Sequence, residues 1–255
     1  MVGIRYTTLK RDNYRVGKMS SLKPVYLLAG GRPRNPSSFN PLFQAVFKES
    51  GKTSPSIAYV GAASDDSKAF YLMMAAALKG SGAGKVRLAA LSSKKADVQK
   101  AKDILESSDI VYVSGGDVEH GMQVLAEKNM IDFIVGLYRK DKPFFGISAG
   151  SIMLAKGWIR WRDPEDDATA EIFPCLGIAP VICDTHGEQD GWEELQALLK
   201  LEKDGTIGHG IVSGTAIKVF PDGKVEALGG AIHQYAKRNG KVERLANILP
   251  DSKSL

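Results

Sequence analysis

The chain has 255 residues, of which 44% are hydrophobic and 25% are charged, the composition of an ordinary soluble globular protein. No run is long and apolar enough to span a bilayer and no secretory leader is recognisable, so we expect a cytoplasmic protein without a membrane partner. The two cysteines and four histidines lack the spacing of a disulfide framework or of a metal site, and no metal is expected.

The net charge of +5 is concentrated at the start of the chain. Residues 1–23 carry six basic side chains and one acidic side chain, whereas residues 24–255 carry equal numbers of both. The excess therefore belongs to a loosely ordered basic arm over residues 1–23 and not to a nucleic-acid-binding face. We expect residues 24–255 to form a single α/β domain with no nucleic-acid partner.

Short apolar segments alternate with segments of helical spacing through the first 147 residues. This alternation predicts parallel βαβ units, in which ligands bind beyond the carboxyl ends of the strands. No G-x-G-x-x-G follows the first strand, so no dinucleotide or other cofactor is expected. The expected strands are residues 24–28, 56–60, 85–91, 109–113 and 143–147, and the expected helices are residues 40–50, 67–79, 94–107, 118–127 and 131–140.

The remaining elements are less regular. Phe70, Met73, Met74 and Ala77 form a stripe that we assign to core packing. Residues 158–170 are polar and predict a loop, which either covers the site or is a solvated insertion. A sixth strand over 180–183 and a helix over 192–201 follow. The last segments predict short antiparallel strands, at residues 210–213, 215–220, 225–229 and 231–235, with a hairpin turn at 221–223.

The strongest functional signal is the Gly-x-Ser-x-Gly segment formed by Gly146, Ser148 and Gly150. It joins an apolar strand directly to a helix, as in a nucleophile elbow, where a sharp turn exposes one serine. Glycines suit the strained backbone and the close approach of the next helix. The alternative is a β–α turn in which Ser148 only caps the helix.

Other residues fall on the same predicted edge. His186 follows an apolar strand directly and is the best candidate for the base that activates the serine hydroxyl. The N–H groups of Ala149 and Gly116 are candidates for an oxyanion hole. Asp117 is either a helix N-cap or a substrate-binding residue.

The segments 146–151, 115–117 and 184–186 together resemble the serine peptidases typified by dipeptidase E and cyanophycinase. Those proteins share the flavodoxin-like, doubly wound, mostly parallel sheet of the class I glutamine amidotransferases, with helices on both faces. The resemblance extends from about Val25 to Lys218 and includes Ala63 and Ser64. It implies hydrolysis of peptide-type bonds in small substrates, either Asp-X dipeptides or the β-aspartyl-arginine linkage, with Ser148 as nucleophile and His186 as base.

One position departs from the family pattern. The family places a glutamate in a Gly-x-x-Glu-x-Thr-Ala segment to orient the histidine, and here Ser213 occupies that position. Glu188, two residues after His186, is the expected substitute, because the amidotransferases of this fold use a His-x-Glu spacing. Asp184 and Asp190 are weaker candidates.

Two other functions agree with parts of the sequence. An α/β-hydrolase-type esterase would use Ser148, Asp222 and His233 in that chain order. A catalytically impaired or inactive binding protein on the same fold would account for Ser213. The expected partner of the active form is a small peptide, whose carboxylate would be recognised by arginines, the candidates being Arg160, Arg162, Arg32 and Arg34.

Overall fold

The computed structural model describes residues 22–30 and 39–251. The basic arm expected over residues 1–23 lies almost wholly outside this part, as do Arg32 and Arg34. No helix among the described residues combines the length and the apolar character needed to cross a membrane.

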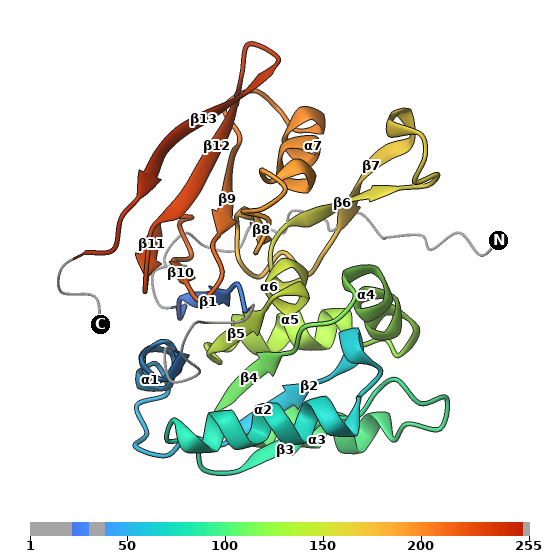
Figure 1. Ribbon diagram of the computed structural model, residues 1–255. Helices are drawn as coiled ribbons and strands as arrows, with labels where there is room; N and C mark the ends of the chain where they lie inside the picture. Colours follow the sequence, from blue (N-terminus) through green and yellow to red (C-terminus); the bar gives the residue numbers. More distant parts are fainter. Residues whose placement is uncertain (1–21, 31–38, 252–255) are drawn as a thin grey trace.

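A seven-stranded, mostly parallel sheet forms the centre of the molecule (Figure 1). Its order is β11-β10-β1-β5-β4-β2-β3. The last five strands are mutually parallel, and β10 runs antiparallel to both of its neighbours, β1 and β11. The bounds are β1 Val25–Leu28, β2 Ile57–Val60, β3 Val86–Leu88, β4 Ile110–Val113, β5 Phe144–Ile147, β10 Ala216–Val219 and β11 Val225–Leu228.

Helices cover both faces of this sheet, as the doubly wound fold class predicts. One face packs on α1 (Phe39–Lys48) and α2 (Lys68–Gly80). The other packs on α3 (Val98–Ser107), α4 (Val118–Glu127), α5 (Ile131–Arg139) and α6 (Ala149–Leu154). The parallel strands are buried along their whole length, except for the end of β3, because both sheet faces are covered.

The Met-aromatic stripe expected on α2 is only partly right. Ala75 and Leu78 are buried and Met74 packs beside them, whereas Met73 is 57% exposed. Ala77 is exposed as well. The buried face follows positions 71, 74, 75 and 78, which is helical spacing rotated by about one residue from the predicted stripe.

The expectation of a loop over residues 158–170 is wrong. These residues belong mainly to an antiparallel hairpin of β6 (Gly157–Trp161) and β7 (Ala170–Pro174), and only residues 162–169 connect the two strands. The polar residues of that connection dominate the composition of residues 158–170, so the segment reads as a loop. The β-prone residues on either side, such as Trp158 and Ile159, form the strands.

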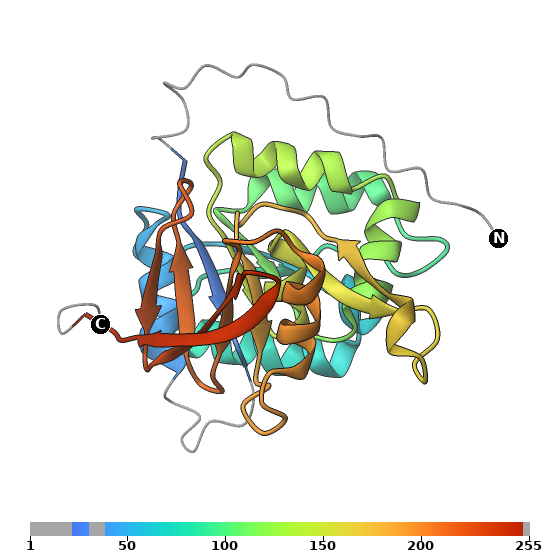
Figure 2. The ribbon, with the colours of Figure 1, turned by 90° about the horizontal axis from the view of Figure 1, so that it is seen from above.

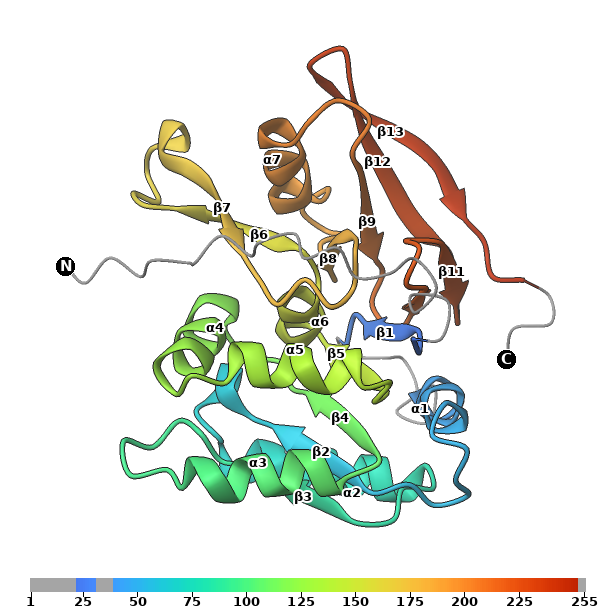
Figure 3. The same ribbon diagram turned by 180° about the vertical axis from the view of Figure 1, so that it is seen from behind.

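A second sheet has the order β13-β12-β9-β8. Its strands are β8 (Ile182–Thr185), β9 (Ile207–Ile211), β12 (Ile232–Arg238) and β13 (Lys241–Ile248), and α7 (Glu193–Leu201) packs on it. Seen from above, α7 lies beside β12 and β13, and the β6–β7 hairpin extends to one side (Figure 2). Helix α6 lies between the two sheets in both the front and the rear view (Figures 1 and 3).

Candidate active site

The turn from β5 into α6 has the backbone of a strained elbow. Ser148 has φ 53° and ψ −125°, a region that residues other than glycine occupy at a cost of about 1–3 kcal/mol. Two hydrogen bonds to the Leu28 carbonyl hold it: the Ser148 N–H donates at 2.9 Å and the Ser151 hydroxyl at 2.8 Å. A Cβ on Gly150 would lie 2.1 Å from the carbonyl oxygen of Val113, which confirms that the motif glycines allow close packing of α6.

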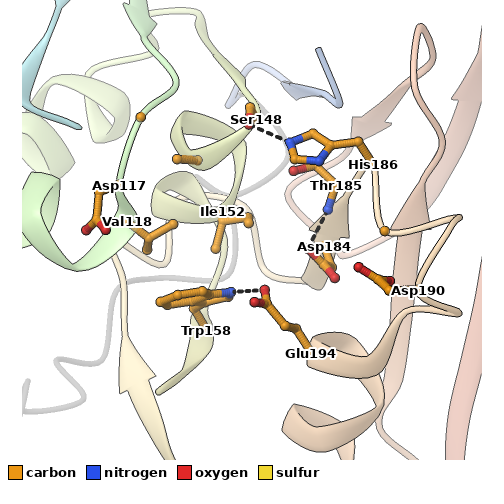
Figure 4. Close-up of a pocket in the computed structure, with 13 residues that line it drawn as sticks. Asp117, Val118, Ser148, Ile152, Trp158, Asp184, Thr185, His186, Asp190 and Glu194 are labelled. Carbon is orange, nitrogen blue, oxygen red and sulfur yellow. Dashed lines mark hydrogen bonds between the residues drawn. The ribbon is translucent and has the colours of Figure 1, made fainter. Parts of the chain in front are cut away.

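His186 reaches this elbow from the second sheet. It follows β8 directly with φ 48°, and its N–H donates to the Ile211 carbonyl at 3.0 Å, which continues the β8–β9 pairing. Its Nε2 lies 2.8 Å from the Ser148 hydroxyl oxygen (Figure 4). The serine and the imidazole therefore come from different sheets and meet within hydrogen-bond distance.

The loop after β4 approaches the same point. Gly116 has φ 143°, and a Cβ there would lie 1.9 Å from the Ala63 carbonyl oxygen, so only glycine fits. That carbonyl accepts a hydrogen bond from the Asp117 N–H at 2.8 Å. A Cβ on Gly115 would lie 3.8 Å from the Ser148 hydroxyl oxygen. The loop is thus held between the Ala63 segment and the elbow.

A cavity of about 240 Å³ lies beside Ser148 and His186. Gly116 and Ala149 border it, and its apolar wall consists of Val118, Ile152 and Trp158. Four acidic residues also line it, namely Asp117, Asp184, Asp190 and Glu194 (Figure 4), and Thr185 and Gly187 complete the described lining.

Two of these carboxylates have perturbed acidity. Burial raises the pKa of Asp184 to about 7, and the neighbouring Glu194 and Asp190 carboxylates add to the effect. Burial also raises the pKa of Glu194, although its hydrogen bond from the Trp158 indole N–H at 3.1 Å opposes the shift. Like charges in a partly dehydrated cavity disfavour ionisation.

Asp117 has the N-cap role considered for it from the sequence, whereas its role in substrate binding stays a prediction. Its side chain accepts the His120 N–H at 2.7 Å and caps α4, and it also borders the cavity.

Arg160 and Arg162 do not line the cavity in the described structure. Arg160 pairs with Glu119 of α4 at 2.8 Å and with Glu171 of β7, and it lies over the Phe173 ring. Arg162 is 75% exposed and pairs with Glu171 at 2.6 Å. Both arginines therefore pair with Glu171 across the β6–β7 hairpin, and their proposed role in substrate binding gains no support from this arrangement.

Glu188 lies near the position where the family has its acid. One carboxylate oxygen accepts the N–H of Ser213 at 3.3 Å, and the other is buried with no hydrogen-bond partner among the described residues. Within the described chain, no hydrogen bond joins Glu188 to His186. The two sequence positions considered for the acid, 188 and 213, are thus adjacent in space.

The alternative esterase triad is not assembled. Asp222 lies in the turn between β10 and β11, where its carboxylate accepts the Lys224 N–H at 2.9 Å. His233 lies on β12 and accepts the Trp192 indole N–H at 2.8 Å. Neither residue lines the cavity beside Ser148.

Sequence reasoning did not single out Trp158 or Glu194. Trp158 fell in the segment expected to be a loop, and Glu194 is one of several acidic residues at the start of a helix. The usable signal was the position of Glu194 shortly after His186, which places the first turn of α7 near the base.

The comparisons with known proteins identify the family. The family model described as Peptidase family S51 matches residues 25–227. The chain belongs to peptidase family S51. This confirms the resemblance found in the sequence, although none of the curated proteins compared with the chain gives a significant match.

Solved structures show the same fold as this S51 member. A peptidase from an acI-B1 Actinobacterium is 15% identical, with a TM-score of 0.67 over 89% of this chain and 97% of that chain. A putative peptidase E protein from Listeria monocytogenes EGD-e is also 15% identical, with a TM-score of 0.58 over 88% of this chain and all of that chain. At this level of identity the likeness concerns the fold.

Proposed function

We propose that this S51 peptidase is a serine hydrolase that cleaves peptide-type bonds in small substrates. The observation that carries the proposal is the 2.8 Å contact between the Ser148 hydroxyl and His186 Nε2 at a strained elbow. Backbone strain at a residue that borders a cavity is typical of functional sites. The cavity of about 240 Å³ beside this pair is the place where the substrate would bind.

In the proposed mechanism, Ser148 Oγ attacks the scissile carbonyl carbon while His186 Nε2 accepts the hydroxyl proton. The imidazolium then donates this proton to the leaving amine, and an acyl-enzyme remains on Ser148. Water, deprotonated by the same ring, attacks the ester carbonyl carbon; the C–O bond to Ser148 then breaks, the acid product leaves, and His186 returns the proton to Ser148 Oγ. The N–H groups of Ala149 and Gly116 stabilise the negative oxygen of each tetrahedral intermediate.

Glu188 is the proposed acid of the triad. Its carboxylate contacts the backbone of Ser213, the position that holds a glutamate in the family pattern, and it retains one buried oxygen without a partner among the described residues. A charged carboxylate there would stabilise the imidazolium from nearly the same place, although it comes from a different loop.

Ser148→Ala tests the nucleophile. Hydrolysis of a dipeptide panel that includes Asp-X and β-Asp-Arg members should fall to background, and a serine-reactive phosphonate should no longer label the protein. Ser107→Ala, an exposed serine on α3, is the matched control and should keep both activities. Unchanged hydrolysis in Ser148→Ala overturns the site, whereas a folded wild type that never forms an adduct favours the inactive binding protein.

Glu188→Gln tests the acid. We expect kcat to fall by about two to four orders of magnitude on every substrate, with the melting temperature little changed. Adding Ser213→Glu should restore part of the loss, because it returns a carboxylate to the family position. Glu243→Gln, at an exposed site on β13, serves as control. Full activity in Glu188→Gln would transfer the role to Asp184 or Asp190.

A further inference from the structure

The aspartate and glutamate side chains that line the cavity beside Ser148 have no lysine or arginine in its described lining to balance them. Asp117, Asp184, Asp190 and Glu194 line it, and no lysine or arginine is among the described lining residues. A substrate with an acidic side chain would meet these carboxylates at close range. The arginines considered for such a substrate are engaged elsewhere or lie outside the described residues.

Three of these carboxylates lie close to one another: Asp184 is buried, Glu194 is half-buried and Asp190 is exposed. Asp184 is 6% exposed, accepts the Thr185 N–H at 2.7 Å and interacts electrostatically with Glu194 and Asp190. None of the three has a salt bridge to a lysine or arginine in the described part of the chain. The buried Asp184 and half-buried Glu194 carboxylates are the ones that a cation would stabilise most, and a cationic substrate group in the cavity would supply one.

Hydrogen bonds also fix the positions of the Glu194 and Asp190 side chains. The Trp158 indole N–H donates to Glu194 at 3.1 Å, and the Asp190 carboxylate accepts the Trp192 N–H at 3.0 Å. Figure 4 shows Asp184, Asp190 and Glu194 together on one side of the cavity, with Trp158, Ile152 and Val118 along the other. An apolar wall beside an acidic one fits the methylenes and the charged end of a basic side chain.

We propose that Asp184, Asp190 and Glu194 determine specificity by binding a cationic group of the substrate, an ammonium or a guanidinium, beside the bond that Ser148 attacks. This rests on the proposed function of the same site. Among the substrates considered from the sequence, it favours those recognised by a positive charge over those recognised by an acidic side chain. The group is either the free α-ammonium of a short peptide or a basic side chain.

The first experiment measures binding without turnover, by isothermal titration of the full chain carrying Ser148→Ala. N-acetylargininamide against N-acetylnorleucinamide tests a guanidinium, and glycinamide against N-acetylglycinamide tests an α-ammonium. At least one cationic ligand should bind ten-fold or more tightly than its neutral match. Glu194→Gln or Asp190→Asn should reduce this ratio to within about two-fold. These changes keep an oxygen acceptor for Trp158 or Trp192.

Asp222→Asn, in the exposed turn between β10 and β11, is the control and should leave the ratio unchanged. No preference for either cation, or a preference that survives all the carboxamide changes, overturns the proposal. Because no hydrolysis is involved, this result does not depend on whether Ser148 is the nucleophile.

The second experiment compares Arg-X, Leu-X and Asp-X dipeptides on the active enzyme. Glu194→Gln should raise KM for the cationic substrate ten-fold or more while kcat changes little, and it should narrow the difference from Asp-X. An equal loss of kcat on all substrates would contradict a role in specificity. A wild type that prefers Asp-X would overturn recognition of a basic side chain. Recognition of the α-ammonium, which all three dipeptides carry, would be overturned if Glu194→Gln left KM unchanged on all of them.

Discussion

The residues of the elbow have opposite steric requirements. Ser148 carries a side chain at positive φ, whereas Gly150 has no space for one because the Val113 carbonyl lies against it. The backbone strain at Ser148 is tolerated because Gly150 allows α6 to pack closely on β4 and β5. A methyl group at position 150 would push the helix, and with it the hydroxyl, away from His186.

Gly150→Ala should therefore destabilise the protein by about 1–3 kcal/mol or more and abolish Ser148 labelling. Gly136→Ala is the matched control: it lies within α5, with no atom within 4 Å of the added Cβ, and should stabilise by up to about 1 kcal/mol. Chemical denaturation and phosphonate titration measure the two effects. A fully reactive Gly150→Ala protein would show that the elbow tolerates displacement.

Asp184 provides a pH-dependent prediction. Burial, followed by the Glu194 and Asp190 carboxylates, raises its pKa to about 7 in the folded protein, against about 3.9 in an unfolded chain. The stability that the protonated group confers is present below about pH 4 and is lost as pH rises through about 7. Asp184→Asn should thus gain melting temperature relative to wild type between pH 5 and pH 8.

Thermal unfolding at several pH values measures this gain, with Asp222→Asn as the exposed control. A difference between Asp184→Asn and wild type that stays constant over this range would show that the carboxyl does not titrate there. The variant should also lose preference for cationic ligands, so stability and specificity would change in opposite directions.

At the scale of elements, the β6–β7 hairpin connects parts that are remote in sequence. Arg160 joins it to α4 through Glu119, while Trp158 joins it to α7 through Glu194. The position of the apolar cavity wall depends on both contacts. The polar composition of residues 162–169 hid this hairpin from sequence analysis, because strand pairing depends on a partner that composition does not reveal.

Arg160→Gln should raise KM several-fold and lower stability by about 1 kcal/mol or less, as expected for a partly exposed ion pair. The matched change Arg162→Gln should have little effect, since the Arg162 side chain pairs with Glu171 at the surface and is 75% exposed. Steady-state kinetics and thermal unfolding of both variants test this difference. Equal effects would mean that the pair with Glu119 does not position the cavity wall.

The order of the elements was largely predictable from sequence, and their partners were less so. Alternation of apolar runs and helical spacing identified the parallel strands and the turn that carries Ser148. β8 also looked like a parallel strand, and it is one, but it pairs with β9 of the second sheet. β13 was missed because its exposed and half-exposed residues show no buried face. The proximity of His186 to Ser148 was expected, but at the edge of a single sheet, whereas the two residues come from different sheets.

At the scale of the whole molecule, the proposed catalytic pair spans two sheets. The main sheet carries Ser148, the second sheet carries His186, and α6 lies between them. Hydrolysis therefore requires the relative placement of the sheets as well as the integrity of each. The acid position instead belongs to the second sheet alone, because Glu188 and Ser213 come from loops at the ends of its neighbouring strands β8 and β9.

The three tryptophans of the sequence all lie outside the main sheet: Trp158 and Trp161 are on β6, and Trp192 directly precedes α7. Indole emission consequently acts as a built-in optical reporter for the part of the molecule that supplies His186 and the cavity wall. In increasing urea, the emission change and the loss of phosphonate labelling should share one midpoint, even if circular dichroism shows that the parallel layer persists to higher concentrations.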